Sequence, residues 1–207
     1  MNIIILIILL ILIFTIILSI YKWFYDQHNN PERIYINDNN NKNKNRKPKK
    51  ILSFNTALIP IQLKLDLVKK KADIIASWIL NDLPNSDIDV IVFQEMWTKS
   101  WTNNIYNNLK KIGWNIIYQP NETKKPLSSG LLLATPLPIK NINMASYENC
   151  SCWDCLADKG FISAEIGGIN IFNTHLQDDS VDFFDVRSKQ LESIISSATD
   201  SKLPVVI

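Results

Sequence analysis

The 207-residue sequence predicts an α+β protein with two packed β-sheets flanked by helices, preceded by an N-terminal membrane anchor and a linker. Three observations support this fold class. An uncharged apolar run occupies residues 3–20. Short apolar runs bounded by turn residues recur from residue 51 onward, and apolar residues at helical spacing separate several of them. Since helices lie between strands and strands outnumber them, we expect helical layers covering sheets.

The N-terminal run is the first element. Residues 3–20 carry no charge and are interrupted only by Thr15 and Ser19, so the run reaches the lower length limit for spanning a bilayer. No basic segment precedes it and no small-x-small cleavage site follows it, which argues against a cleaved signal peptide. We therefore expect residues 1–25 to form a single-pass transmembrane anchor, with the bilayer as a partner.

Residues 26–48 are rich in Asn and Lys and offer little apolar surface to bury, so we expect a flexible linker there. Residues 1–50 contain eight basic and three acidic residues, whereas residues 51–207 contain 14 and 17. The domain after the linker is thus mildly acidic, which disfavours nucleic acid as its partner. Its side of the membrane stays open: the basic linker favours the cytoplasm, but glycosylation acceptors at Asn121 and Asn149 would suit a lumenal domain.

Residues 49–207 form the predicted domain. Apolar runs predict strands at 51–55, 88–95, 114–118, 130–134, 161–166, 169–173 and 203–207. Helical spacing predicts helices at 64–81, from about 101 to 113, and at 186–198. A Gly-Gly pair at 167–168 predicts a tight hairpin between two of the strands. No element follows the last strand, so we expect a C-terminally incomplete domain.

Three predicted strands have, at or near their ends, a polar residue suited to metal-assisted phosphodiester chemistry: Asn55, Glu95 and His175. Taken singly, each residue type more often has a structural role, in a turn, at a strand end or in a hydrogen bond. Taken together, a carboxylate could bind Mg²⁺ and an amide could orient a carboxylate, a phosphate or a water. An imidazole could stabilise charge that develops on a phosphoryl oxygen.

The segment 150–160 carries a second group of candidate residues. Lys159 could contact a substrate phosphate and Asp154 could restrain it by pairing, although an ordinary surface loop is the alternative reading. The chain's three cysteines, Cys150, Cys152 and Cys155, are too few and too clustered for a disulfide framework, and a zinc site would need a fourth ligand. We expect a loop with free thiols, with one bridge inside the loop as the alternative.

These residues occur in an order that resembles the endonuclease/exonuclease/phosphatase superfamily. The ordered set comprises Asn55, Phe93-Gln94-Glu95-Met96-Trp97, Ser129-Gly130-Leu131, Asp158-Lys159-Gly160, Asn173-Thr174-His175-Leu176-Gln177, Arg187 and Gln190. Within the superfamily the chain most resembles the neutral sphingomyelinases, the magnesium-dependent phospholipase C type. The Glu95–Trp97 segment and the loop from Asp154 to Lys159 carry that closer resemblance, which covers about residues 49–207.

The resemblance implies a four-layer sandwich and a membrane-anchored enzyme that hydrolyses sphingomyelin to ceramide and phosphocholine. It implies Mg²⁺ on Glu95, Asn55 in the site, His175 on the scissile phosphate, and Asp154 and Lys159 in a substrate-gating loop. The family's Gly-Asp-x-Asn segment and late Ser-Asp-His, which supplies the general base, do not occur in these 207 residues. We therefore expect a nearly inactive fragment. A nuclease or phosphoinositide phosphatase of the same superfamily, and a non-catalytic truncated paralogue, are the alternatives.

Overall fold

The computed structural model describes residues 3–28, 33–37, 46–59, 65–120, 125–178 and 183–207, leaving aside the side chains of residues 3–4, 20–28 and 65. The helices are α1 (Ile3–His28), α2 (Leu65–Asn81), α3 (Lys99–Lys111) and α4 (Phe184–Thr199), with short 3₁₀ helices η2 (Leu83–Asn85) and η3 (Cys152–Leu156). The strands are β1 (Ile34–Tyr35), β2 (Ile51–Asn55), β3 (Val90–Gln94), β4 (Asn115–Tyr118), β5 (Leu132–Thr135), β6 (Ile139–Ser146), β7 (Gly160–Ile166), β8 (Ile169–Thr174) and β9 (Val205–Val206).

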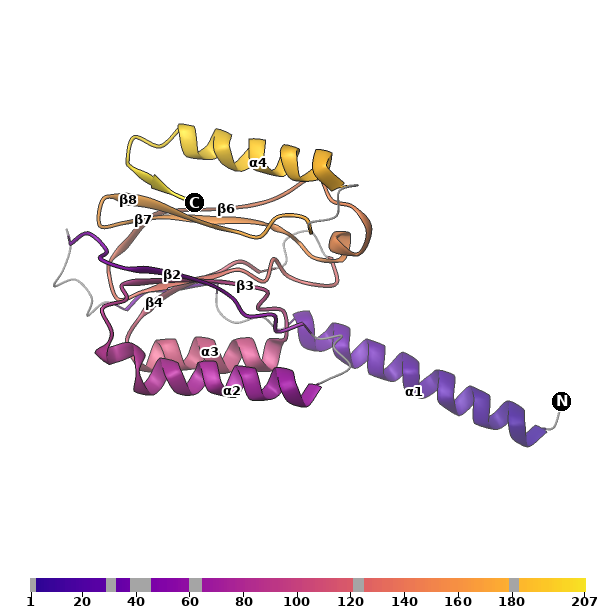
Figure 1. Ribbon diagram of the computed structural model, residues 1–207. Coiled ribbons are helices and arrows are strands. Elements are labelled where there is room, and N and C mark those ends of the chain that lie inside the picture. The colour runs from indigo at the N-terminus through magenta and orange to yellow at the C-terminus, as the bar shows by residue number, and fades with distance from the viewer. Residues whose placement is uncertain (1–2, 29–32, 38–45, 60–64, 121–124, 179–182) are drawn as a thin grey trace.

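The described strands form two mixed sheets. The first sheet has the order β1-β4-β5-β3-β2 and the second has the order β6-β7-β8-β9. Strands β2 and β3 are parallel, as are β8 and β9, while the other neighbours are antiparallel. Figure 1 shows α2 and α3 covering the outer face of the first sheet and α4 covering the outer face of the second. The predicted pair of packed sheets flanked by helices is therefore confirmed.

Three apolar clusters hold these layers together. Between the sheets, the inner faces meet through side chains that include Val92, Leu133, Ile162, Ala164 and Ile171. A larger cluster joins α2 and α3 to the first sheet, and a smaller one joins α4 to the second sheet. Burying apolar area between layers is the main favourable term in folding such a domain, so the layered arrangement follows from where these residues recur.

Helix α2 illustrates how the sequence specifies a layer. Val68, Ala72, Ile75 and Ile79 recur at helical spacing, and all four are buried against the first sheet. The helix ends just before η2, whose Pro84 cannot continue the helical hydrogen-bond pattern. The predicted helix at residues 64–81 is thus confirmed almost to its ends, as are the helices that correspond to α3 and α4.

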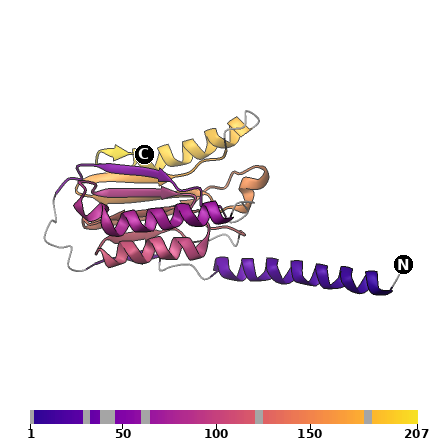
Figure 2. The same ribbon diagram turned by 60° about the horizontal axis from the view of Figure 1, so that its bottom comes forward.

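The N-terminal helix α1 projects from the layered body in both views (Figures 1 and 2). The large apolar side chains described between Ile5 and Leu18 are all exposed. In the part of the chain that the structure describes, no helix combines the length and the apolar character needed to cross a membrane. The structure therefore gives the predicted transmembrane anchor no support.

The flexible linker at residues 26–48 stays a prediction, because the structure describes only residues 26–28, 33–37 and 46–48 of it. Residues 26–28 complete α1, and Ile34–Tyr35 form β1, which pairs with β4. Arg46 makes two hydrogen bonds to the buried carboxylate of Asp89, at 2.9 and 2.5 Å. Two features explain these contacts with the domain. Ile34 and Tyr35 are apolar residues within a polar segment, and the buried carboxylate of Asp89 needs a cationic partner, which Arg46 supplies.

Strand β6 (Ile139–Ser146) was not predicted. It pairs with β7, but the register shifts between Lys140 and Asn143, and Asn141 has a φ of +48°. This bulge breaks the alternation of apolar and polar residues on which the prediction of a strand depends. The hairpin between β7 and β8 was predicted correctly, with Gly167 and Gly168 at φ values of +58° and +80°.

Candidate active site

Three side chains predicted as site residues meet at one end of the sandwich. Asn55 ends β2, Glu95 follows β3, and His175 follows β8 on the facing sheet. The Asn55 Nδ2 donates a hydrogen bond to Glu95 Oε1 at 2.5 Å. The His175 Nε2 lies 3.6 Å from the same carboxylate oxygen. The structure therefore brings an amide, a carboxylate and an imidazole from distant parts of the sequence into one cluster.

The backbone at this edge adopts a conformation that L-residues rarely take. Glu95 has a φ of +58° and Ala57 has a φ of +49°. Two hydrogen bonds hold these turns: the Leu58 N–H donates to the Glu95 carbonyl at 3.1 Å, and the Ala57 N–H donates to Asn55 Oδ1 at 2.9 Å. Left-handed backbone at a non-glycine residue costs on the order of 1–3 kcal/mol and tends to occur at functional sites. The strain here lies at a predicted metal ligand.

A buried pair of amides links the two sheets directly behind the cluster. We call Gln94 and Asn173 the inter-sheet amide pair. Gln94 Nε2 donates to Asn173 Oδ1 at 2.7 Å, and Asn173 Nδ2 donates to the carbonyls of Phe93 at 2.9 Å and Leu132 at 3.1 Å. Gln94 precedes Glu95 and Asn173 lies two residues before His175. By joining the two sheets at this point, the pair helps to fix the distance between the Glu95 carboxylate and the His175 imidazole.

Sequence reasoning gave the inter-sheet amide pair no role of its own. Both residues are polar positions at the ends of otherwise apolar runs, and both are buried, with 8% of Gln94 and 1% of Asn173 exposed. A buried side-chain amide must find hydrogen-bond partners within the fold. This requirement could have indicated that both amides have partners inside the fold. It could not indicate that Gln94 and Asn173, which are 79 residues apart, bind each other.

The imidazole of His175 lies against an aromatic ring in a mostly buried position. Its ring centroid lies 5.9 Å from that of Trp97, with an interplanar angle of 39°. Burial lowers the pKa of His175 below its usual value, and the nearby Lys159 lowers this pKa further, whereas Glu95 and Asp154 act in the opposite direction. The neutral imidazole is therefore favoured at pH 7. Its Nδ1 is buried with no hydrogen-bond partner among the described residues.

The predicted pairing of Lys159 with Asp154 is present. Lys159 Nζ lies 2.6 Å from Asp154 Oδ2 and donates to the Leu176 carbonyl at 2.7 Å. Only 3% of the Lys159 side chain is exposed, so this charge is held almost out of contact with solvent. Asp154 Oδ2 also accepts from the Asp178 N–H at 2.9 Å. The lysine thus lies beside His175, while its role toward a substrate stays a prediction.

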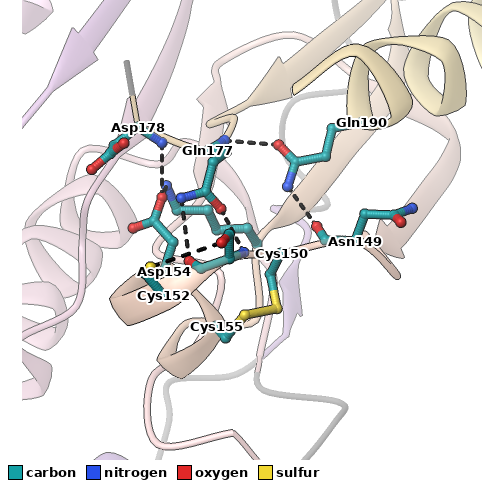
Figure 3. The surroundings of a disulfide bond; sticks show 10 residues. Asn149, Cys150, Cys152, Asp154, Cys155, Gln177, Asp178 and Gln190 are labelled. Atoms are coloured by element: carbon teal, nitrogen blue, oxygen red, sulfur yellow. Dashed lines mark hydrogen bonds and ion pairs between the residues drawn. A yellow bond between two sulfur atoms is a disulfide. The ribbon is translucent and has the colours of Figure 1, made fainter. Parts of the chain in front are cut away.

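Figure 3 shows the loop that carries Asp154, and a disulfide closes it. Cys150 and Cys155 are bonded, and Cys152 has a free, exposed thiol. The expectation of free thiols was therefore wrong for two of the three cysteines, and the bridge inside the loop is the correct alternative. Spacing alone could not decide this, because any two of three cysteines this close in sequence can approach one another.

Two buried glutamines fix this loop to the segment that follows His175. Gln177 Oε1 accepts from the Ser151 N–H at 3.0 Å, and Gln177 Nε2 donates to the Ser151 carbonyl at 3.3 Å. Gln190, from α4, donates to the Asn149 carbonyl at 2.7 Å and accepts from the Gln177 N–H at 2.7 Å (Figure 3). The disulfide loop, the His175 segment and α4 are therefore one hydrogen-bonded unit.

The donor atoms at this edge fit a magnesium ion better than a softer metal. Among the residues that the structure describes, no group of three or more His, Cys, Asp or Glu side chains could hold a metal ion. Magnesium, however, commonly takes one or two carboxylates and keeps several of its waters. Glu95 supplies one carboxylate, oriented by the amide of Asn55. These two residues suit such a hydrated ion, and they do not suit a site built from protein ligands alone.

No protein-family model matches the chain, and no curated protein matches its sequence. Solved structures do match its fold. A structure of SmcL is 20% identical, with a TM-score of 0.61 over 74% of this chain and 58% of that one. Sphingomyelinase C from Streptomyces griseocarneus is 17% identical, with a TM-score of 0.58 over 74% and 59%.

A mutant of beta toxin from Staphylococcus aureus with bound magnesium ions is 16% identical, with a TM-score of 0.60 over 74% of this chain and 60% of that one. The chain thus spans about three fifths of the length of these matched structures. At these identities the likeness concerns the fold. The chain shares its fold with these structures, one of which is a sphingomyelinase C, as the resemblance read from its sequence implied.

Proposed function

We propose that this chain is the N-terminal part of a magnesium-dependent phosphodiesterase that hydrolyses sphingomyelin to ceramide and phosphocholine. The observation that carries the proposal is the meeting of Asn55, Glu95 and His175 around one carboxylate oxygen. It occurs in a fold shared with a sphingomyelinase C. The acidic balance of residues 51–207 favours a lipid substrate over a nucleic acid.

The residues of the cluster take separate roles in this proposal. Glu95 would hold Mg²⁺, and Asn55 keeps that carboxylate oriented through its hydrogen bond. The bound ion would polarise a phosphoryl oxygen and stabilise the leaving alkoxide. His175, neutral at pH 7, would donate a hydrogen bond to the phosphoryl oxygen on which charge develops. Lys159 would exchange Asp154 for the substrate phosphate, a charge-assisted contact of the same kind.

Unpaired edges of both sheets support the proposal that further chain completes the domain. Strand β2 pairs only with β3 among the described strands, and Ile51 and Phe54 are each 36% exposed. Strand β9 lies at the corresponding edge of the second sheet, where Val206 and Ile207 are exposed. A pocket of about 110 Å³ opens between these two edges. Apolar strand edges of this kind normally pair or are covered.

The exposed helix α1 supports the proposal that the protein associates with a bilayer. The large apolar side chains described on α1 are between 42% and 61% exposed, and they occur on all faces of the helix. The hydroxyls of Thr15 and Ser19 donate to carbonyls within the helix, at 2.8 Å each, and so need no water. A substrate that lies in the membrane would be reached most readily by an enzyme held at its surface.

A parallel assay tests the proposed activity. The 207-residue chain, and a protein continued along its reading frame past Ile207, are incubated with sphingomyelin vesicles, single-stranded DNA or inositol phosphates, with and without Mg²⁺. We expect magnesium-dependent release of phosphocholine by the longer protein, abolished by Glu95→Gln and unaffected by Glu192→Gln, a control on the exposed face of α4.

Three outcomes would contradict parts of the proposal. Hydrolysis of DNA or of inositol phosphates, with sphingomyelin left intact, would replace the substrate with that of another member of the superfamily. Turnover by the 207-residue chain that Glu95→Gln abolishes would show that the missing base is not needed. A reading frame that supplies neither a Gly-Asp-x-Asn segment nor a late Asp-His would favour a non-catalytic protein.

A further inference from the structure

The most exposed of the large hydrophobic side chains described in the structure is Trp153, at 85%. It lies on η3, in the loop between the bonded cysteines. Tryptophan is usually among the more buried residue types, because its ring carries a large apolar area. An indole left almost wholly in water therefore calls for a reason.

The exposure of Trp153 belongs to a loop that is fixed in place. The disulfide between Cys150 and Cys155 closes the loop around it. Gln177, which is labelled in Figure 3, makes two hydrogen bonds to the backbone of Ser151. These contacts fix the backbone of the loop, and the fixed loop carries the indole of Trp153 in its exposed position.

The loop also places Trp153 at the rim of the candidate active site. Its neighbour Asp154 pairs with Lys159, and the charges of both act on His175. Asp154 further accepts from the Asp178 N–H, in the segment that follows the histidine. Anything that contacts the indole is therefore brought close to the residues proposed to bind the phosphodiester.

We propose that Trp153 is a lipid contact that inserts at the headgroup level of the bilayer and docks the candidate site on the membrane surface. This inference rests on the proposed function, which puts the substrate in that bilayer. Trp is enriched at membrane interfaces because one end of its ring is apolar and the other carries an N–H. Helix α1 leaves the layered body at the same end as η3 in both views (Figures 1 and 2).

The surroundings of Trp153 favour a lipid surface over a protein partner. A standard protein interface needs roughly 20–30 residues on each side, with an apolar centre. The residues beside Trp153 in sequence are Ser151, the thiol Cys152 and the ion-paired Asp154, so its neighbours along the loop add no apolar surface of the kind that a protein interface needs.

Fluorescence quenching on vesicles tests the contact with the full 207-residue chain. Vesicles of phosphatidylcholine and sphingomyelin are made with acyl chains brominated near the headgroup. Emission of the wild type and of Trp153→Phe is recorded in each, and the difference spectrum isolates Trp153. We expect that difference spectrum to shift to shorter wavelength on vesicles and to lose most of its intensity with the brominated lipid. The matched control is Trp78→Phe on α2, which packs against the core; its difference spectrum should not change.

A dye on the free thiol of Cys152 gives a second reading that does not depend on tryptophan emission. We expect its emission to shift to shorter wavelength on vesicles, with the shift lost in Trp153→Ala. The proposal is overturned if the Trp153 difference spectrum is unquenched and the dye unshifted, whether or not the chain floats with the vesicles. Because neither readout involves hydrolysis, this contact can fail while the proposed activity stands, and the reverse.

Discussion

The inter-sheet amide pair gives a prediction whose size follows from its contacts. Asn173→Ala removes three hydrogen bonds, of 2.7, 2.9 and 3.1 Å, and leaves Gln94 Nε2 with only a 3.3 Å contact to Ser53 among its described partners. At a net value near 1 kcal/mol for each bond, unfolding should become easier by about 3 kcal/mol. For a chain of this size that corresponds to a fall in Tm of roughly 6–12 °C.

Thermal and urea unfolding followed by tryptophan fluorescence measures this change. The matched control is Asn170→Ala on the same strand, whose Oδ1 is buried without a hydrogen-bond partner among the described residues. Its free energy of unfolding should stay within about 0.5 kcal/mol of the wild type. In a double-mutant cycle, Gln94→Ala and Asn173→Ala should show a coupling energy of about 1 kcal/mol. Equal stabilities for the two asparagine variants would refute the account of the pair.

Three further perturbations test other parts of the fold. Gly130→Ala places a Cβ 2.5 Å from Trp97 Nε1 at a φ of +70°, so we expect a loss of at least about 2 kcal/mol in unfolding free energy and altered near-ultraviolet dichroism. Burial acts to raise the pKa of Asp89, but hydrogen bonds from Arg46 and the Lys49 N–H outweigh it and hold this pKa below its usual value. The stability from Asp89 is therefore present above about pH 4 and is lost as pH falls through the lowered pKa, so urea titrations should show the deficit of Asp89→Asn shrinking in acid. Reducing the Cys150–Cys155 bond, which spans five positions, should lower unfolding free energy by about 2 kcal/mol, and a Cys152→Ser control should lose as much on reduction.

The layered fold could be predicted from the sequence because its signals are local. Apolar runs such as Val90–Phe93 lie wholly within one buried strand, and each can be recognised from a few consecutive residues. The site could be predicted in outline for a related reason. Parallel β2 and β3 end at the same edge of the first sheet, which brings the chain positions of Asn55 and Glu95 near one another.

The elements that sequence analysis missed depend on contacts between distant residues. Strand β1 is only two residues long and exists because β4 offers it a free edge, so no periodic signal marks it. The bulge in β6 hides its alternation. The choice of Cys155 over Cys152 as the partner of Cys150 is made by the loop conformation, in which Gln177 and Ser151 take part. None of these features can be recognised from a short stretch of consecutive residues.

The strained backbone at Glu95 shows why the arrangement of the residues in a site is harder to predict than which residues belong to it. A regular strand would continue past Gln94 and point the next side chain along the sheet. Instead the chain turns at a φ of +58°, and the carboxylate meets Asn55 and His175. The cost of that turn is offset by contacts on both sides of it, since the Glu95 carbonyl accepts from Leu58 and Gln94 is bound across the sheets to Asn173. The candidate metal ligand is thus placed by residues that do not themselves take part in the proposed chemistry, and replacing them should displace the carboxylate while every predicted site residue remains in the sequence.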